Sequence, residues 1–328
     1  MVRIVALEEH FMVPELLHAW ARLPQAQQER LSGCGDDPIS RRLRDVGDGR
    51  VADMDDQGVD VQVLSLNTPG VQNLAPGEAV SVAREANDAL ADIVRGRPDR
   101  FQGFAAVPTP DPQAAASELR RAVHELGLQG ALLNGRTGTT NMDAAEYDDL
   151  YGVAAELRVP LYLHPQTPVG PVQEAYYSGF GDPVDFLFAN FGLGWHYETG
   201  IQLLRLIFAG VFDRHPQLQV IVGHWGEVVL FFVERTAMMQ GMGLHLDRPL
   251  ADYFRQNVWV TGSGLMSERY LRWTAEVVGV DRILYATDYP FIDTSSGQAR
   301  SFLEQASLSA AEREAIGCGS WERLTRAG

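Results

Sequence analysis

Four short apolar runs in the sequence each end in residues that can bind a metal ion or move a proton. The first run ends in the letters LEEH. Because side chains alternate along a strand, Glu8 and His10 are expected on one face of it. Three later runs are followed by His164, His224 and Asp288. Carboxylates and imidazoles are ligands for divalent cations and also common acid–base groups. The pattern predicts a catalytic site at the ends of these runs.

These residues need a fold that brings the ends of several strands together. Apolar runs with the length of buried strands alternate along the chain with amphipathic segments that predict helices, at 77–95, 112–126, 144–157, 200–212, 228–238 and 267–278. The expected strands are 3–7, 61–66, 101–107, 130–133, 160–163, 218–222, 258–261 and 282–286. This order predicts an α/β fold, a single (β/α)8 barrel over residues 1–328, with its active site at the carboxyl ends of the strands. An open doubly wound sheet is the alternative, although no dinucleotide or Walker motif follows any strand.

A long segment rich in aromatic residues and glycine, 165–199, follows the fifth expected strand. Its position is suited to a lid over a substrate, and a packed cap or a subunit interface is the other interpretation. His196 lies in this aromatic-rich insertion and could reach the site, but we expect a structural role for it. Glu198 and Glu227 are expected to brace neighbouring elements.

The composition of the chain excludes several classes of binding partner and of catalytic mechanism. The chain has 328 residues, and its 43 acidic residues exceed the 27 basic ones by 16, so neither nucleic acid nor a membrane surface is an expected partner. Every basic residue is arginine, which excludes a lysine Schiff base or a carbamylated lysine between two metals. Cys34 and Cys318 are not spaced like the paired cysteines of a metal site, and two cysteines do not make a disulfide framework. The first residues do not resemble a signal peptide either. We therefore expect the protein to work in the cytoplasm. A small-molecule enzyme fits these features.

Motifs over nearly the whole chain carry a family resemblance. They are VALEEHF at 5–11, LSLNTPGVQ at 64–72, RPDRFQGFAAVP at 97–108, LGLQGALLNG at 126–135, VPLYLHP at 159–165, ETGIQLLRLIFAGVFDRHPQLQVIVGHWGE at 198–227 and DRILYATDYPF at 281–291. With these motifs the sequence resembles the amidohydrolase superfamily. Within it, the chain is similar to the metal-dependent nonoxidative decarboxylases of the γ-resorcylate (2,6-dihydroxybenzoate) decarboxylase group.

The resemblance implies a ligand set and catalytic residues. One divalent cation, zinc or manganese, would be held by Glu8, His10, His164 and Asp288. Catalytic roles are implied for Asp288, for His224 in GHWGE, and for Arg235, an arginine that helps hold the substrate and in some relatives comes from a neighbouring subunit. A homodimer or homotetramer is implied as well.

The activity implied is decarboxylation of a hydroxylated aromatic acid, an ortho-hydroxybenzoate-like small molecule. A proton is added to the ring carbon first and the C–C bond then breaks, with Asp288 as proton donor and the His224 imidazolium as the alternative donor. The same residues could instead activate water for hydrolysis of an amide, lactone or enol ester, with Asp288 as general base. Another C–C lyase or a hydratase is also compatible with them.

The chain departs from the γ-resorcylate decarboxylase pattern in two loops at the expected active face. Arg136 and Thr137 stand where phenylalanine and serine are typical, and Gln166 replaces the arginine of an HPRNP motif. In the tail, Ser320 replaces a familiar asparagine. The loop changes predict a different aromatic acid as substrate, of larger size.

Overall fold

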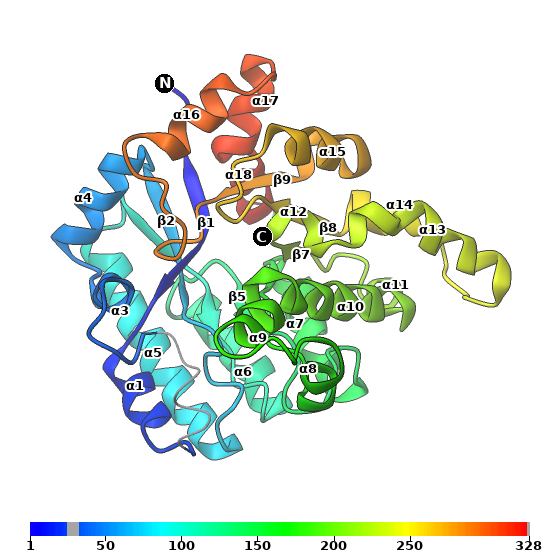
Figure 1. The fold of residues 1–328 in the computed structure, drawn as a ribbon, viewed down its shortest axis with the longest axis horizontal. Helices are drawn as coiled ribbons and strands as arrows, with labels where there is room; N and C mark the ends of the chain where they lie inside the picture. The colour runs from blue at the N-terminus through cyan, green and yellow to red at the C-terminus, as the bar shows by residue number, and fades with distance from the viewer. Residues whose placement is uncertain (25–32, 327–328) are drawn as a thin grey trace.

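The computed structural model describes residues 1–24 and 33–326, and its centre is one parallel sheet (Figure 1). The strand order is β3-β2-β1-β9-β8-β7-β6-β5-β4. The strands are β1 (Val5–Phe11), β2 (Val61–Leu66), β3 (Phe101–Gly103), β4 (Ala105–Ala106), β5 (Ala131–Leu133), β6 (Leu161–Leu163), β7 (Val220–Val222), β8 (Val258–Thr261) and β9 (Ile283–Ala286). Each of the eight expected strands overlaps one or two of these elements.

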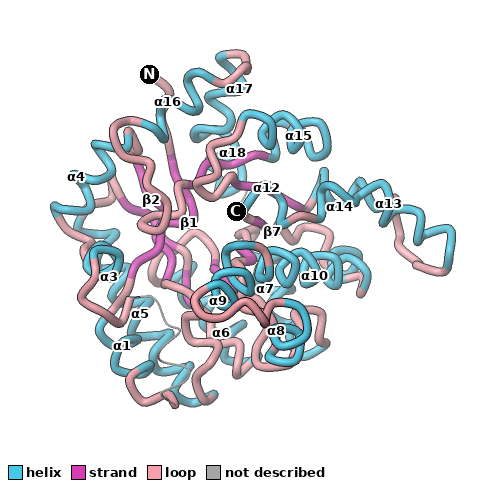
Figure 2. Tube along the Cα trace, viewed as in Figure 1, coloured by secondary structure: helices cyan, strands magenta, loops and turns pink. Residues whose placement is uncertain are grey.

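The sheet closes into a barrel because one chain segment pairs with both of its edges. The expected strand 101–107 is divided at Phe104 into β3, which pairs with β2, and β4, which pairs with β5. Phe104 N–H donates to Leu64 O at 2.9 Å, and the next residue, Ala105, donates to Gly130 O at 2.8 Å. The strands therefore lie inside a ring of helices (Figure 2), and the (β/α)8 barrel is confirmed.

Helices alternate with the strands, and most of them cover the outside of the barrel (Figure 1). They are α1 (Pro14–Trp20), α3 (Pro38–Arg44), α4 (Asp48–Gln57), α5 (Pro76–Gly96), α6 (Pro112–His124), α7 (Asp148–Leu157), α10 (Gly194–Phe208), α11 (Val211–Arg214), α12 (His224–Glu227), α13 (Val233–Ala237), α14 (Leu250–Gln256), α15 (Glu268–Val278), α16 (Gln298–Gln305), α17 (Ala310–Glu314) and α18 (Ser320–Arg326). Local sequence determines where such helices begin. At the start of α6, for example, the Asp111 side chain caps the helix by accepting a hydrogen bond from Ala114 N–H at 3.0 Å. No described helix is long and apolar enough to cross a membrane.

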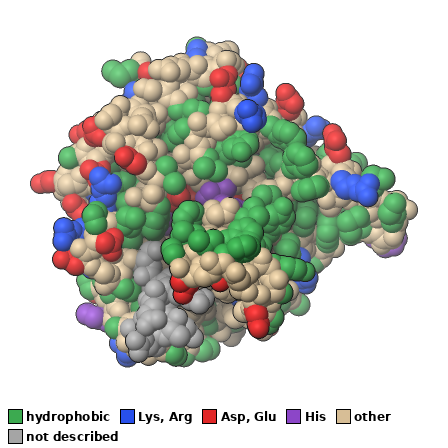
Figure 3. All heavy atoms as spheres, in the orientation of Figure 1, with side chains coloured by type: hydrophobic (Ala, Val, Ile, Leu, Met, Phe, Trp, Pro, Cys, Tyr) green, Lys and Arg blue, Asp and Glu red, His purple; other side chains and the backbone are tan. Residues whose placement is uncertain are grey.

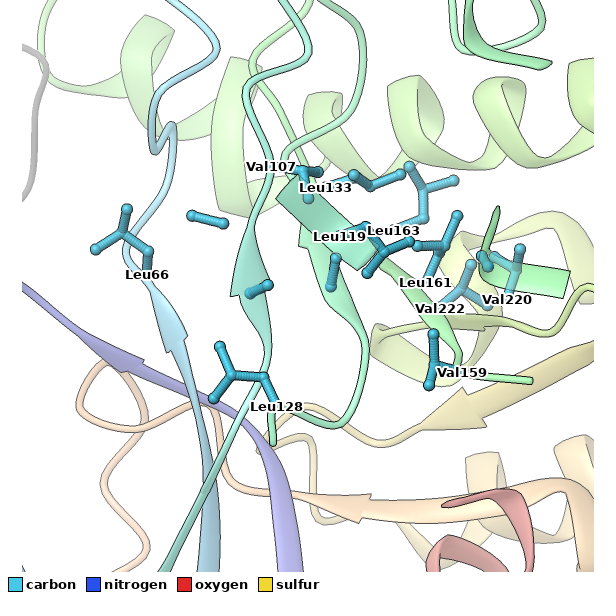
Figure 4. Close-up of a cluster of buried hydrophobic side chains, with 14 of the residues drawn as sticks. Leu66, Val107, Leu119, Leu128, Leu133, Val159, Leu161, Leu163, Val220 and Val222 are labelled. Carbon is cyan, nitrogen blue, oxygen red and sulfur yellow. The ribbon is translucent and has the colours of Figure 1, made fainter. Parts of the chain in front are cut away.

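Two hydrophobic layers hold the barrel. Inward-facing side chains, among them Leu7, Val63 and Tyr162, form one buried cluster that Trp321 of α18 joins. Outward-facing strand residues pack against the helices, as Leu161 and its neighbours in the sheet do in Figure 4. Burial on both faces explains why most residues of these strands are apolar, with Gln62 and Gln102 among the exceptions.

A bulge in β1 decides which way its polar residues face. The pairing with β2 shifts register between Ala6 and Glu9, and Glu8 has a φ of 63°. Because Leu7 points into the barrel, plain alternation would send Glu8 and His10 outward to the helices. The bulge reverses the alternation, so Glu8 and His10 turn inward at the end of the barrel while Glu9 faces outward.

The aromatic-rich insertion forms short helices beside the barrel mouth. It contains α8 (Gly170–Tyr176), α9 (Val184–Leu187), the π-helical η2 (Phe188–Gly192) and the first turns of α10. A helix was expected only from residue 200, whereas α10 begins at Gly194. A second expected helix, 228–238, is divided into the 3-10 helix η3 (Val229–Phe232) and α13.

Candidate metal centre and active site

Glu8, His10 and His164 meet at the carboxyl ends of β1 and β6. Glu8 Oε1 lies 3.4 Å from His164 Nε2, and the two imidazole rings have centroids 4.8 Å apart. Asp288, after β9, joins them with its Oδ1 at 3.5 Å from His10 Nε2. Glu8 Oε1 and His10 Nε2 are both buried without a hydrogen-bond partner. Unpartnered buried polar atoms are costly, so these two atoms fit ligands of a cation better than structural groups.

Neighbouring hydrogen bonds leave one polar atom of Glu8 and one of His164 available to a cation. Glu8 Oε2 accepts from the Tyr162 hydroxyl at 2.5 Å and from the Ser263 hydroxyl, which leaves Oε1 available. His164 Nδ1 lies 2.9 Å from Pro165 O, to which its N–H can donate, so that Nε2 points toward Glu8. Such outer bonds fix the ring orientation and the tautomer of metal-binding histidines.

The protonation states of this cluster also suit a cation. Burial raises the pKa of Glu8 and of Asp288 to about 7, since each carboxylate lacks sufficient compensating charge. Burial, with the charge of Arg50, lowers the pKa of His10 to about 3, and burial lowers that of His164 as well. The imidazoles are therefore neutral, as ligation requires, and a divalent cation would supply the charge that the carboxylates lack.

These raised carboxyl pKa values predict pH-dependent metal binding. In the folded metal-free protein, Glu8 and Asp288 keep their protons up to about pH 7. Their contribution to folding stability is therefore present in acid and lost as the pH rises through this value. A cation must displace these protons, so its affinity should rise from pH 6 to pH 7 by about 10-fold or more and then level off. Calorimetric titration with Mn²⁺ at several pH values measures this, and a flat affinity over that range would contradict it.

Beside this cluster, Glu227 joins two histidines. His224 Nδ1 lies 2.7 Å from Glu227 Oε1, and His196 Nδ1 lies 2.8 Å from Oε2 of the same buried carboxylate. Burial disfavours a charged His224, but the charges of Glu227 and Glu8 outweigh it and raise its pKa to about 10. Burial disfavours the Glu227 carboxylate too, yet the His224 charge lowers its pKa to about 2. The pair is an imidazolium with a carboxylate near neutral pH.

An unusual backbone after β7 places His224 and Glu227. His224, Trp225, Glu227 and Val228 have φ values of 47°, 59°, 51° and 60°, in the left-handed region that non-glycine residues seldom adopt. The turn also includes the first residue of the helix expected over 228–238, so that helical structure begins at Val229. Backbone strain of this kind persists where surrounding contacts enforce it and is frequent at active sites.

His196 is the residue that sequence reasoning undervalued. Its expected structural role is met by the bond to Glu227, but its ring also lies 4.5 Å from the His224 ring, centroid to centroid. The only signal in the sequence was its position in the insertion after a strand end. As expected, Glu227 and Glu198 brace other residues, Glu198 through an ion pair with Arg136 at 2.8 Å.

A pocket of about 1460 Å³ opens above these clusters. His10, His164, His224 and Asp288 line it. Aromatic residues of the insertion and of later segments complete the wall: Phe186, Phe191 and Trp195 from the insertion, and Trp225, Phe231, Tyr270, Trp273 and Phe291 from beyond it. The space-filling view shows histidine at the base of a hollow surrounded by hydrophobic side chains (Figure 3). Arg235 is not among the lining residues, since it lies on α13 with an exposed side chain.

The geometry has close counterparts among known proteins. The amidohydrolase family profile matches residues 15–323, so the chain belongs to this family. The γ-resorcylate decarboxylase of Rhodococcus jostii is 37% identical, over 95% of each chain. The crystal structure of a dihydroxybenzoic acid decarboxylase from Polaromonas, with bound manganese and the inhibitor 2-nitroresorcinol, matches with a TM-score of 0.86 and 35% identity over 99% of this chain and 97% of that one. That of 5-carboxyvanillate decarboxylase from Sphingomonas paucimobilis matches with a TM-score of 0.91 and 29% identity over 99% of both.

Proposed function

We propose that this protein is a metal-dependent nonoxidative decarboxylase of a hydroxylated aromatic carboxylic acid. The observation that carries the proposal is the cluster of Glu8, His10 and His164 beside Asp288 at the base of an aromatic-lined pocket. Two atoms of this cluster that could bind a metal ion, Glu8 Oε1 and His10 Nε2, have no hydrogen-bond partner. Relatives named as decarboxylases of γ-resorcylate and 5-carboxyvanillate support it, and so does the manganese in one of them. Manganese is the expected cation and zinc the alternative.

Direct loss of CO₂ would leave an aryl carbanion, so the ring carbon must be protonated first. A divalent cation held by Glu8, His10, His164 and Asp288 would supply the positive charge that fixes the carboxylate and an ortho hydroxyl of the substrate. Asp288 is the proposed proton donor, and the proton that it passes on would come from the ortho hydroxyl of the substrate as that hydroxyl ionises. Its proton bonds to the carboxyl-bearing carbon. The electron pair of the breaking C–C bond then returns to the ring as CO₂ leaves, which restores aromaticity.

His224 is the second catalytic residue that we propose. The Glu227 carboxylate keeps its imidazolium charged and holds Nδ1, so that the other ring nitrogen is free to act. The His224 imidazolium stabilises negative charge on a substrate or on Asp288, and it is the alternative proton donor.

A substrate panel tests the function. The Mn²⁺-loaded protein is incubated with hydroxybenzoates that differ in the number and position of their hydroxyl groups, and released CO₂ is measured together with bound metal. We expect one metal per chain and release from ortho-hydroxylated acids alone. Bound metal with hydrolysis of ester or amide probes, and no CO₂, would replace the proposal by a hydrolase.

We also propose a homodimer or homotetramer in which Arg235 holds the substrate of a neighbouring subunit. The support is an arm that projects from the barrel at α13 (Figure 1). It exposes apolar side chains that follow Arg235 in the chain, including Met238, which is 52% exposed, and Met242, which is 77% exposed. Exposed apolar surface of this density is typical of contacts between protein chains.

Arg235→Met is expected to raise KM by about 10-fold, because a cation is removed from an anionic substrate, without loss of bound metal. Steady-state kinetics measure this, with Arg95→Met on α5 as the exposed control. If Arg235 acts across subunits, hybrids of Arg235→Met and Asp288→Asn chains should regain activity that neither parent has at low substrate. An unchanged KM would contradict the role, and light scattering reports the oligomeric state.

We propose further that residues 1–328 act as one domain and that the protein works in the cytoplasm. The described strands belong to one barrel, and α18 packs into its interior through Trp321, which supports a single unit. Cys34 and Cys318 are both free thiols, as suits a reducing compartment.

A further inference from the structure

A fully buried arginine lies behind the candidate metal centre, on the outer side of the barrel wall. Arg50 belongs to α4, and its Nη1 donates to the backbone oxygen of His10 at 2.7 Å while its Nε donates to Gln62 Oε1 at 2.6 Å. The guanidinium also lies over the Tyr289 ring, 4.4 Å from its centroid, and Nη2 has no hydrogen-bond partner. Because an apolar side chain in place of a buried charge is often as stable, stability alone does not explain this arginine.

A buried carboxylate completes the contacts of Arg50. Gln62 Nε2 donates to Glu9 Oε2 at 3.0 Å, so one glutamine links the arginine to Glu9. Glu9 accepts from the backbone N–H of Thr287 at 2.8 Å and from the Thr287 hydroxyl at 2.7 Å. Thr287 is the residue before Asp288. The buried arginine and the buried glutamate therefore hold the backbone at the end of β1 and the backbone beside Asp288.

The two backbone segments that Arg50 and Glu9 hold also contact each other. His10 N–H donates to Tyr289 O at 2.8 Å, so the backbone of His10 is held by the segment after Asp288 on one side and by Arg50 on the other. These segments carry two of the proposed ligand atoms, His10 Nε2 and Asp288 Oδ1, which lie 3.5 Å apart. Metal–ligand distances are set to within about 0.2 Å, so a small shift of either backbone would weaken the site.

We propose that Arg50 is a positioning residue, which fixes His10 relative to Asp288 and thereby raises the affinity of the site for its cation. The inference rests on the proposed function, because it concerns the metal ligands of that same site. Arg50 is not among the residues that line the described pocket, so it acts on cation and substrate only through the backbone that it holds. Contacts of this kind around metal ligands typically contribute 10- to 100-fold to metal affinity, written as about one to two decades.

The test measures cation binding by the folded protein. Mn²⁺ affinity is determined calorimetrically for wild type and for Arg50→Met, which keeps the length of the side chain and removes its donors. We expect the affinity to fall by about 10-fold or more. The direction is decisive, because removal of a nearby positive charge would by itself strengthen cation binding. At saturating Mn²⁺, kcat for CO₂ release should also fall by about 10-fold, with KM within about 2-fold of wild type.

Arg300→Met on α16 is the matched control. Arg300 is also mostly buried, and it donates to a backbone oxygen, that of Val2, and to Asp60 at 2.9 Å, at the opposite end of the barrel. A thermal melt of each metal-free variant reports its stability. Arg300→Met should bind Mn²⁺ like wild type however far its melting temperature falls.

Two further variants separate the charge of Arg50 from its contacts. Arg50→Lys retains the charge and a donor but not the two-nitrogen geometry, so its Mn²⁺ affinity should lie between those of wild type and Arg50→Met. If Arg50→Met does not fold, because Glu9 is left without its countercharge, Arg50→Met combined with Glu9→Gln removes both charges and carries the same expectation.

Unchanged or tighter Mn²⁺ binding by Arg50→Met would overturn the inference, and so would a loss no larger than that of Arg300→Met. A wild type that binds no Mn²⁺ would overturn both this inference and the proposed function. Weaker Mn²⁺ binding by Arg50→Met, in a protein that releases no CO₂ from any acid tested, would leave the inference standing and refute the decarboxylase proposal. Release of CO₂ by a wild type whose Mn²⁺ affinity does not depend on Arg50 would do the reverse.

Discussion

Asp288→Asn should lower kcat for CO₂ release by about 10³-fold or more, because it removes the proton donor and one carboxylate of the metal cluster together. Asparagine keeps the size and the oxygen near His10, where Asp288 Oδ1 lies 3.5 Å from Nε2. It cannot give up a proton at neutral pH. A loss of rate with substrate affinity retained would therefore identify the proton, rather than the shape of the pocket, as the contribution of Asp288.

Three measurements separate the effects. Bound Mn²⁺ reports ligand loss, kcat reports the reaction, and deuterium exchange into the phenolic product in D₂O reports proton transfer alone. Asp293→Asn is the matched control, since this exposed aspartate lies on the same loop. We expect the Asp288 variant to lose exchange as well as release. Exchange that survives in Asp288→Asn but disappears in His224→Gln would assign the donor role to the imidazolium.

Glu8→Gln should abolish cation binding and with it activity, by about 10³-fold, because an amide cannot replace the buried carboxylate charge. Oε2 of Glu8 already accepts hydrogen bonds from Tyr162 and Ser263, so Oε1 is the oxygen left for a cation. The substitution removes the negative charge that this oxygen would offer. Unlike the wild type after chelation, the variant should not recover when Mn²⁺ is added back. Its hydroxyl partners would also face an amide nitrogen in one of the two amide orientations.

The check is metal content and CO₂ release before and after chelation and Mn²⁺ addition, with the exposed Glu85→Gln on α5 as control. A thermal melt shows whether the variant folds. Full metal content with full activity in Glu8→Gln would remove Glu8 from the ligand set. Activity of the wild type that survives complete chelation would refute metal dependence itself.

Much of the fold could be predicted because its signals are local. Apolar runs bounded by turns identified the barrel strands, and two of them, β2 and β8, have the bounds expected from the sequence. Helix starts such as Pro112 were readable from a capping aspartate and a proline. The division of strand 101–107 was not readable, because it arises from pairing with two partners far apart in the chain.

The barrel, its carboxyl-end site and the residue types gathered there could be predicted from the sequence, because periodicity and strand ends are encoded locally. The bulge at Glu8, which turns Glu8 and His10 into the barrel when plain alternation would turn them out, is visible only in the folded chain. The same is true of the contact by which His196 shares Glu227 with His224. These contacts join residues distant in the chain, and their geometry depends on the closed barrel rather than on any local preference.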